Sequence, residues 1–196
     1  MNGHRLGPVS GLLLCLLWAP MALVIPRLPD LGSAADVERF WRDNSGLMQV
    51  VLLSVSVGFL FFLTFLGALV GRLRASESSE ALTWTAFGSA LMFMTALNVS
   101  IGLDAAARLL LEDGPPGSTY ALHTAGFVLA APAAFAGVGF FVAVAALTFT
   151  AAVLPRWLGW LAGVGAVANV GAVGGVLSLT GPLNSGNGAL GGIAAR

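Results

Sequence analysis

Long apolar runs dominate this sequence and restrict what it can fold into. Residues 47–71 and 118–154 contain no Asp, Glu, Lys or Arg. About 20 apolar residues in an α-helix are enough to cross the hydrocarbon layer of a membrane. Only 9% of the whole chain is charged, against about 25% in an ordinary soluble domain. So few charges cannot cover a water-facing surface, and we therefore predict an all-α integral membrane helical bundle.

Five such runs set the expected domain organisation. Residues 1–180 are predicted to form one transmembrane domain, and residues 181–196 a Gly- and Asn-rich tail with no folding pattern. The predicted spans are residues 6–25, 47–71, 81–111, 118–154 and 157–179. The first run is also typical of a cleaved signal peptide, but residues 18–26 show no small-residue cleavage site, so we expect it to be retained.

The one long polar connection, residues 26–46, contains a further short helix. Ser33 followed three residues later by Asp36 resembles a capping box and predicts a helix over residues 33–43. Its apolar face consists of Val37, Phe40 and Trp41. Such a face predicts a helix lying on the membrane surface. A lid over an opening between the membrane helices is the alternative.

A proline and an arginine interrupt the apolar sequence between the last two spans. Pro155 disfavours helical geometry at Leu154 and has no N–H to donate, so one helix ends and another begins. Arg156 and the neighbouring Trp157 and Trp160 favour a position at the membrane interface. The sequence here predicts a tight helical hairpin at the membrane face.

The hairpin sequence L-P-R-W-L-G-W, residues 154–160, resembles a family of small bacterial membrane proteins of uncharacterised activity that are frequent in actinobacteria. The order of the parts is also similar, including a polar loop with a short helix. The resemblance implies a helical integral membrane fold and supplies no catalytic residue or cofactor. It also implies a last apolar helix after a segment like residues 181–193, so we expect that a sixth span is absent or that this sequence is a shortened form.

Polar residues near one predicted membrane face are candidates for a binding site. The helix of residues 81–111 is expected to leave the bilayer near Asp104 and Arg108, which are spaced i,i+4 and are expected to pair. The five-span topology places Gln49 and His123 near the same face. A carboxylate and an imidazole there can act as an acid and base pair or relay a proton, whereas the simpler interpretation is a satisfied polar surface.

Two amides are predicted to lie deeper, near the middle of their spans. Asn98 and Asn169 are expected to hydrogen-bond other helices, and the alternative is that they line a pocket together with His123. The full candidate ligand-binding set is Gln49, Asn98, Asp104, Arg108, His123 and Asn169. No catalytic residue and no metal ligand is predicted.

Small residues indicate where helices approach closely. The last span contains Gly159-x-x-x-Gly163 and Gly171-x-x-x-Gly175, and Gly137 belongs to a small-residue strip of the fourth span. We expect these glycines to pack against other helices of the bundle, against a protein partner or against a second copy of the chain.

Several classes of function are not supported by the sequence. The formal net charge is zero and no basic cluster suggests nucleic acid. Cys15 is the single cysteine, and His4 and His123 are the only histidines, so neither an internal disulfide nor a His-rich metal site is available. No cofactor is predicted. No nucleophile elbow, zinc-protease or Walker motif is present.

These features lead to one expected function and two alternatives. We expect a multi-pass protein of the bacterial inner membrane, in contact with lipid, that serves as a binding or accessory subunit without enzyme activity of its own. A transporter or a lipid- or small-molecule-binding protein, with a pocket on the Asp104 and His123 side, is the alternative. An intramembrane enzyme using these two residues is the third. Short segments carrying Arg5, Arg72, Arg74 and Arg156 favour a cytoplasmic amino terminus.

Overall fold

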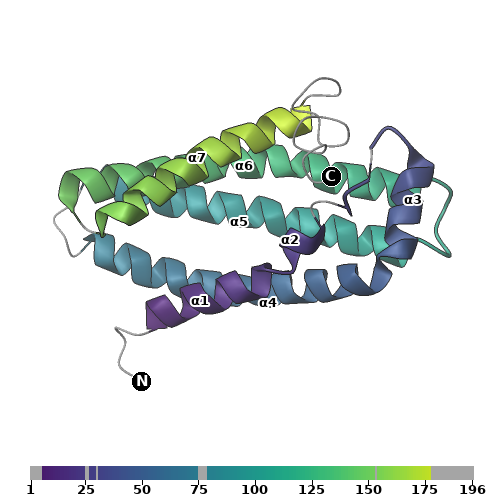
Figure 1. The fold of residues 1–196 in the computed structure, drawn as a ribbon, viewed down its shortest axis with the longest axis horizontal. Coiled ribbons are helices and arrows are strands. Elements are labelled where there is room, and N and C mark those ends of the chain that lie inside the picture. The colour runs from purple at the N-terminus through teal and green to yellow at the C-terminus, as the bar shows by residue number, and fades with distance from the viewer. Residues whose placement is uncertain (1–5, 25–26, 30, 75–78, 153, 178–196) are drawn as a thin grey trace.

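All regular secondary structure is helical in the part of the chain that the computed structural model describes, which is residues 6–24, 27–29, 31–74, 79–152 and 154–177. Figure 1 shows the helices. Their bounds are α1 Leu6–Trp18, α2 Met21–Val24, α3 Ala34–Asp43, α4 Ser45–Arg74, α5 Glu80–Leu109, α6 Ser118–Ala151 and α7 Arg156–Leu177. The all-α prediction is confirmed for these residues, and the predicted tail, residues 181–196, lies outside them.

The long helices run side by side along the long axis of the molecule (Figure 1). Helix α1 packs on α4, and α5 packs on α6, which in turn packs on α7. Contact between α4 and α5 is less extensive, so the bundle consists of an α1–α4 pair and an α5–α6–α7 group. The short α3 lies across one end, where it contacts α4 and α6.

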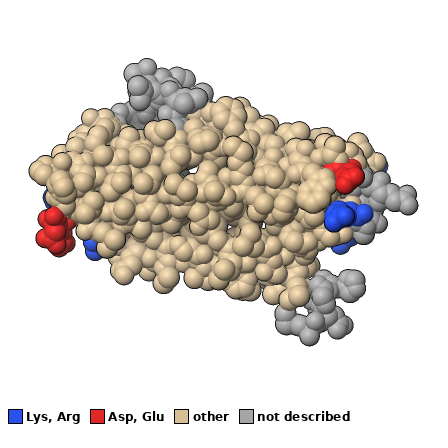
Figure 2. Space-filling model, turned by 180° about the vertical axis from the view of Figure 1, so that it is seen from behind, with Lys and Arg blue, Asp and Glu red and all other residues tan. Residues whose placement is uncertain are grey.

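Three helices, α4, α5 and α6, are long and apolar enough to cross a membrane, which is fewer than the five expected. Helix α1 has 13 residues, too few to span the hydrocarbon layer alone. Helix α7 has 22 residues and is not among these three. Figure 2 shows the charged side chains at the two ends of the long axis, with a broad uncharged surface between them. This distribution is that of a membrane-associated protein.

The prediction of one continuous first span, residues 6–25, is wrong. Helix α1 ends at Trp18, and α2 starts only at Met21. Pro20 disfavours the helical conformation at Ala19 and has no N–H to donate to a helix. The chain instead turns there, and the N–H of Leu23 donates to the carbonyl of Pro20 at 3.0 Å.

The capping signal predicted at Ser33 is confirmed, and a second serine caps the start of α5. The hydroxyl of Ser33 accepts the N–H of Asp36 at 3.3 Å at the start of α3. The hydroxyl of Ser79 accepts the N–H of Leu82 at 3.4 Å at the start of α5. Because these hydroxyls replace missing helical acceptors, each cap sets where its helix begins.

The apolar face of α3 is buried in protein. Val37 and Trp41 are 0% exposed, and Phe40 is buried with them. The three side chains belong to the largest apolar cluster of the core, together with residues of α4 and α5. Helix α3 therefore covers the end of the bundle, which corresponds to the lid arrangement more closely than to a helix resting on lipid.

The predicted hairpin after α6 is present. Helix α6 ends at Ala151, before the expected Leu154, because Ala152 adopts the left-handed conformation with a φ of 50°. The carbonyl of Pro155 then accepts the N–H of Leu158 at 2.9 Å in the first turn of α7. The carboxyl end of the predicted last span, residues 178–179, lies outside the described residues.

Glycines pack the α5–α6–α7 group, but not all of those predicted to do so. A Cβ at Gly137 would lie 2.5 Å from Oδ1 of Asn169, and one at Gly159 would lie 2.9 Å from Phe149. Gly163 and Gly171 face open space, with nothing within 4 Å of such a Cβ. Gly137 and Gly159 thus each meet a side chain of the facing helix in the α6–α7 contact. Gly163 and Gly171 are instead open to contact with another molecule. Gly175 lies in α7, but its surroundings are outside the described part of the chain.

Candidate functional site

A hydrogen-bonded carboxylate and imidazole join α5 to α6 near the end that α3 covers. Nδ1 of His123 lies 2.8 Å from Oδ1 of Asp104. The His123 side chain is 4% exposed and that of Asp104 is 20% exposed. The expected ion pair between Asp104 and Arg108 is wrong, since Asp104 faces α6 and pairs with His123. The Asp104 carboxylate thus bonds across to α6 and does not form the pair with Arg108 along α5 that the i,i+4 spacing favoured.

The backbones of α5 and α6 approach closely beside this pair because Gly126 has no side chain. A Cβ at Gly126 would lie 3.1 Å from the carbonyl oxygen of Ser100 and 3.5 Å from Oδ1 of Asp104. The Ser100 hydroxyl donates to the carbonyl of Gly126 at 2.8 Å. A larger residue at this position would push the two helices apart, so Gly126 allows the carboxylate to reach the imidazole.

Two aromatic residues of α3 enclose the imidazole of His123. Phe40 stacks on it with 5.9 Å between ring centroids and 29° between ring planes. Trp41 meets it edge to face, with 5.7 Å between centroids and 90° between planes. The two aromatic rings therefore cover the imidazole of the Asp104–His123 pair and limit its access to water, and hydrogen bonds are stronger in such surroundings.

Two ring nitrogens in this enclosure have no hydrogen-bond partner. They are Nε2 of His123 and Nε1 of Trp41, both in buried side chains. The indole Nε1 always carries a hydrogen and can only donate. In a neutral imidazole whose Nδ1–H donates to a carboxylate, Nε2 is an acceptor. A buried polar group without a partner costs about 1–3 kcal/mol, so these two atoms are the least satisfied part of the enclosure.

Further hydrogen bonds fix the start of α6 around the pair. The buried Thr119 hydroxyl donates to the carbonyl of Ala107 at 3.2 Å, which ties α6 to α5. The Tyr120 hydroxyl donates to the carbonyl of Leu31 at 2.8 Å, which ties α6 to the segment preceding α3. The imidazole is therefore held by neighbours from three parts of the chain, and its position is well defined.

The other predicted site residues do not take part in this hydrogen bond. Gln49 and Asn98 are exposed, and Arg108 is partly exposed. The side-chain amide of Asn98 donates to the carbonyl of Met94 at 3.1 Å, and that of Asn169 donates to Gly165 at 2.8 Å. Both bonds are within one helix, so these amides do not make the hydrogen bonds between helices that we expected. A shared pocket of Asn98, His123 and Asn169 stays a prediction.

Comparison with known proteins identifies no relative. No family model, no curated protein and no solved structure matches this chain. The resemblance based on the L-P-R-W-L-G-W hairpin therefore stays a prediction. Within the described residues, no group of three or more His, Cys, Asp and Glu side chains lies together in a way that suits a metal ion.

The sequence analysis gave a position of α3 over the site only as its alternative, a lid over an opening between the membrane helices. Phe40 and Trp41 were recognised only as an apolar face, because the 3.6-residue period says which residues are buried but not against what. The close approach of α5 and α6 at Gly126 could have been predicted from the sequence. It follows His123 by three residues and so shares its helix face, where a glycine allows close approach of a neighbouring backbone.

Proposed function

We propose that this protein is a multi-pass membrane protein that binds a small hydroxyl-bearing molecule at the Asp104–His123 pair, without catalysing a reaction on it. The observation that carries the proposal is the pair of unpartnered ring nitrogens of His123 and Trp41 within one buried enclosure. Native structures leave few such atoms unpaired, and a bound molecule is a common reason.

The chemistry of the two nitrogens defines the ligand class. A hydroxyl group is both a donor and an acceptor, so one hydroxyl can accept from Trp41 Nε1 and donate to Nε2 of His123. Phe40, stacked beside them, favours an apolar molecule around that hydroxyl. We therefore propose an uncharged lipid-like alcohol. Asp104 acts by orienting the imidazole, because it holds Nδ1.

Helix α3 supplies a route for the ligand. Among the described residues, its charged face forms local ion pairs, Arg39 with Asp36 at 3.0 Å and Arg42 with Glu38 at 3.3 Å. Exposed pairs of this kind contribute about 0–1 kcal/mol. Helix α3 therefore stays in place mainly through its three buried apolar side chains, and lifting it opens the site without breaking a buried ion pair.

The ligand proposal predicts that a Trp41→Phe variant loses the bound molecule. Phenylalanine keeps an aromatic ring in place but removes the only indole donor at the site, so retention should fall about tenfold. The full chain, purified in mild detergent, is analysed by native mass spectrometry for retained uncharged molecules. His123→Phe should have the same effect.

The matched control is Trp84→Phe, since Trp84 is exposed and donates to Glu80 at 3.2 Å far from the site. This variant should retain the molecule as the wild type does. A wild-type protein that carries no uncharged molecule, or a Trp41→Phe variant that retains it fully, would contradict the proposal.

An accessory role through α7 is a second candidate, supported by the open surroundings of Gly163 and Gly171. Valines exposed on the same helix, such as Val164 and Val167, would complete the contact with a protein partner or a second copy. Enlarging either glycine to leucine should release a copurifying partner or convert an oligomer to a monomer, as measured by light scattering in detergent. Gly88→Leu, at an equally open position on α5, is the control and should change nothing.

The proposed membrane arrangement has five crossings. Helices α4, α5 and α6, which are long and apolar enough to cross, supply three crossings, α7 returns beside α6, and α1 with α2 makes the first crossing. Gly7, Arg72 and Pro155 border one groove, so the start of α1, the end of α4 and the α6–α7 hairpin share one end of the molecule. The arginines at that end support an inner-membrane protein with a cytoplasmic amino terminus.

A further inference from the structure

The protonation of His123 decides whether its Nε2 accepts or donates a hydrogen bond. Nδ1 of His123 lies 2.8 Å from the Asp104 carboxylate. An ionised carboxylate can only accept, so Nδ1 carries the hydrogen of that bond, and in the neutral ring Nε2 is an acceptor. A protonated imidazole carries a hydrogen on both nitrogens, so the same Nε2 becomes a donor. Histidine is the side chain that ordinarily changes its charge between about pH 5 and 8.

This change alters the hydrogen-bonding character of the enclosure under α3. Within the described part of the chain, neither Nε2 of His123 nor Nε1 of Trp41 has a hydrogen-bond partner. The indole Nε1 always donates. The enclosure therefore offers one donor and one acceptor when His123 is neutral, and two donors when it is protonated. Trp41 is 0% and His123 3% exposed, so solvent does not satisfy these atoms and a bound molecule has to match them.

The Asp104 carboxylate allows the buried imidazole to hold a proton. A positive charge on His123 lies within hydrogen-bond distance of the negative charge of Asp104, so it is compensated inside the protein. The Asp104 side chain is 20% exposed and that of His123 is 4% exposed. The carboxylate therefore lies nearer to solvent than the ring and provides a path along which a proton reaches it.

The side chains that face the imidazole from the other elements do not supply this change of charge. Helix α3 faces the ring with the uncharged Phe40 and Trp41, and α4 contributes apolar residues to the same cluster. Arg108 follows Asp104 by one turn on α5 and keeps its charge, because a guanidinium does not lose its proton in proteins. The hydroxyl of Tyr120 donates to the carbonyl of Leu31. The charged residues of α3 are partly or fully exposed, and they are Asp36, Glu38, Arg39, Arg42 and Asp43.

We propose that protonation of His123 changes the ligand that the enclosure accepts, from an alcohol to a carbonyl compound of the same carbon skeleton. The inference rests on the proposed alcohol site and adds its regulation by pH. A hydroxyl suits the neutral form, because it donates to Nε2 of His123 and accepts from Nε1 of Trp41. A carbonyl oxygen has two lone pairs and no hydrogen, so it suits the protonated form by accepting from both nitrogens. The wrong ligand in either form leaves a buried polar group unpaired.

Two probes that differ only in this group test the proposal. They are a secondary dodecanol and the dodecanone of the same skeleton. The full chain in neutral detergent is equilibrated with each probe at about pH 8 and at about pH 5, and bound probe is measured by equilibrium dialysis. The wild type should bind dodecanol about tenfold more tightly than dodecanone at the higher pH, and dodecanone about tenfold more tightly than dodecanol at the lower pH.

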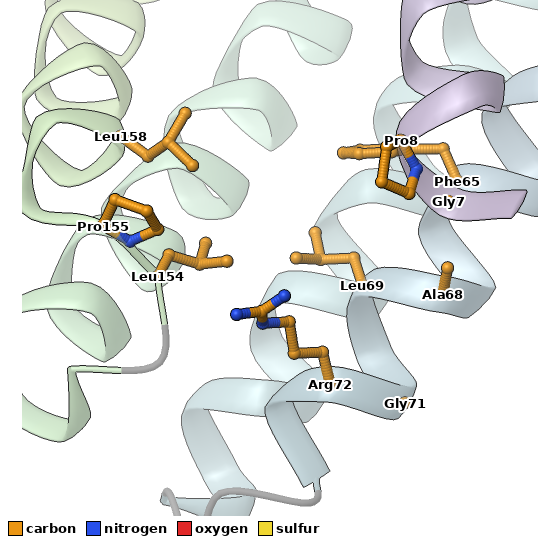
Figure 3. Close-up of a pocket in the computed structure, with 10 residues that line it drawn as sticks. All are labelled: Gly7, Pro8, Phe65, Ala68, Leu69, Gly71, Arg72, Leu154, Pro155 and Leu158. Atoms are coloured by element: carbon orange, nitrogen blue, oxygen red, sulfur yellow. The ribbon is translucent and has the colours of Figure 1, made fainter. Parts of the chain in front are cut away.

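Probe that binds elsewhere on the protein is measured with Trp41→Phe. Figure 3 shows an apolar groove of about 670 Å³ at the other end of the bundle, between α1, α4 and the α6–α7 hairpin. A long-chain probe can bind there without meeting His123. Trp41→Phe leaves this groove unchanged and removes the indole donor of the site, so the binding that remains in this variant sets the background at each pH.

Asp104→Asn separates the effect of the proton from the effect of packing. Asparagine has nearly the same shape as aspartate but no charge, so a protonated imidazole loses its charge-assisted hydrogen bond. Whichever ring nitrogen carries the hydrogen in this variant, its preference between the two probes should no longer change with pH. The control is His4→Gln, which replaces the other histidine of the sequence and should keep the reversal.

The outcomes distinguish failure of the pH switch from failure of the alcohol site. A wild-type preference for dodecanol that is equal at both pH values would overturn the switch and leave the alcohol site intact. Loss of the reversal in His4→Gln, or an unchanged reversal in Asp104→Asn, would also overturn the switch. Equal binding of the two probes by the wild type at the higher pH would overturn the alcohol site and the switch together.

Discussion

Replacing Trp41 by alanine should lower the free energy of unfolding by about 3–5 kcal/mol. Trp41 is the largest fully buried side chain among the described residues, and its ring contacts both Phe40 and His123. Truncation leaves a cavity under α3 and removes the main contact that holds this helix on the bundle. Denaturant titration in detergent micelles, with helicity as the signal, measures the change.

Trp160→Ala is the matched control because Trp160 is 71% exposed. Its unfolding free energy should stay within about 0.5 kcal/mol of the wild type, as for most exposed sites. Hydrogen exchange in α3 should rise in Trp41→Ala and not in Trp160→Ala. Equal stability of the two variants would show that α3 does not hold the buried position described here.

Replacing Gly137 by leucine should cost about 3 kcal/mol through overpacking. A Cβ at this position already lies 2.5 Å from Oδ1 of Asn169 and 3.3 Å from the ring of Phe93. Since α5, α6 and α7 meet here, a leucine has to displace a side chain of each neighbouring helix. The same unfolding experiment reports the effect.

Gly102→Leu serves as the comparison, since nothing lies within 4 Å of a Cβ at this position on α5. It should leave stability unchanged or raise it slightly, because leucine favours helix more than glycine by about 0.8–1 kcal/mol. A Gly137→Leu variant as stable as Gly102→Leu would mean that α6 and α7 are farther apart than described.

The parts of the fold that depend on local sequence were predictable. Apolar runs located α4, α5 and α6, and the capping serine at position 33 located the start of α3. These signals act within a few residues, so they can be read without knowing the neighbours. Helix ends were less predictable, as at Ala152, whose left-handed conformation ends α6 early.

The parts that depend on contacts between helices were not predictable to the same degree. Asp104 has Arg108 at i,i+4 along its own helix, yet its carboxylate meets His123 on α6. Gly163 and Gly159 belong to one motif, yet only Gly159 packs against a neighbour in the bundle. The spacing of residues along the sequence predicts which of them share a helix face. Which helix packs against that face depends on the fold as a whole.

The early end of α1 has a consequence for the lipid around it. Trp18 lies against Gly58, where a Cβ would be 2.5 Å from the indole nitrogen. About 20 Å of α4 separates Gly58 from Arg72, whereas the hydrocarbon layer is about 30 Å thick. In the five-crossing arrangement α1 therefore stops short of the far headgroups, and polar backbone at the break faces the acyl layer. Pro20 reduces the number of these exposed polar backbone groups, because a proline has no N–H. The remaining polar backbone groups should attract water and lipid headgroups into the acyl layer, so we expect the bilayer to be locally thinner next to α1.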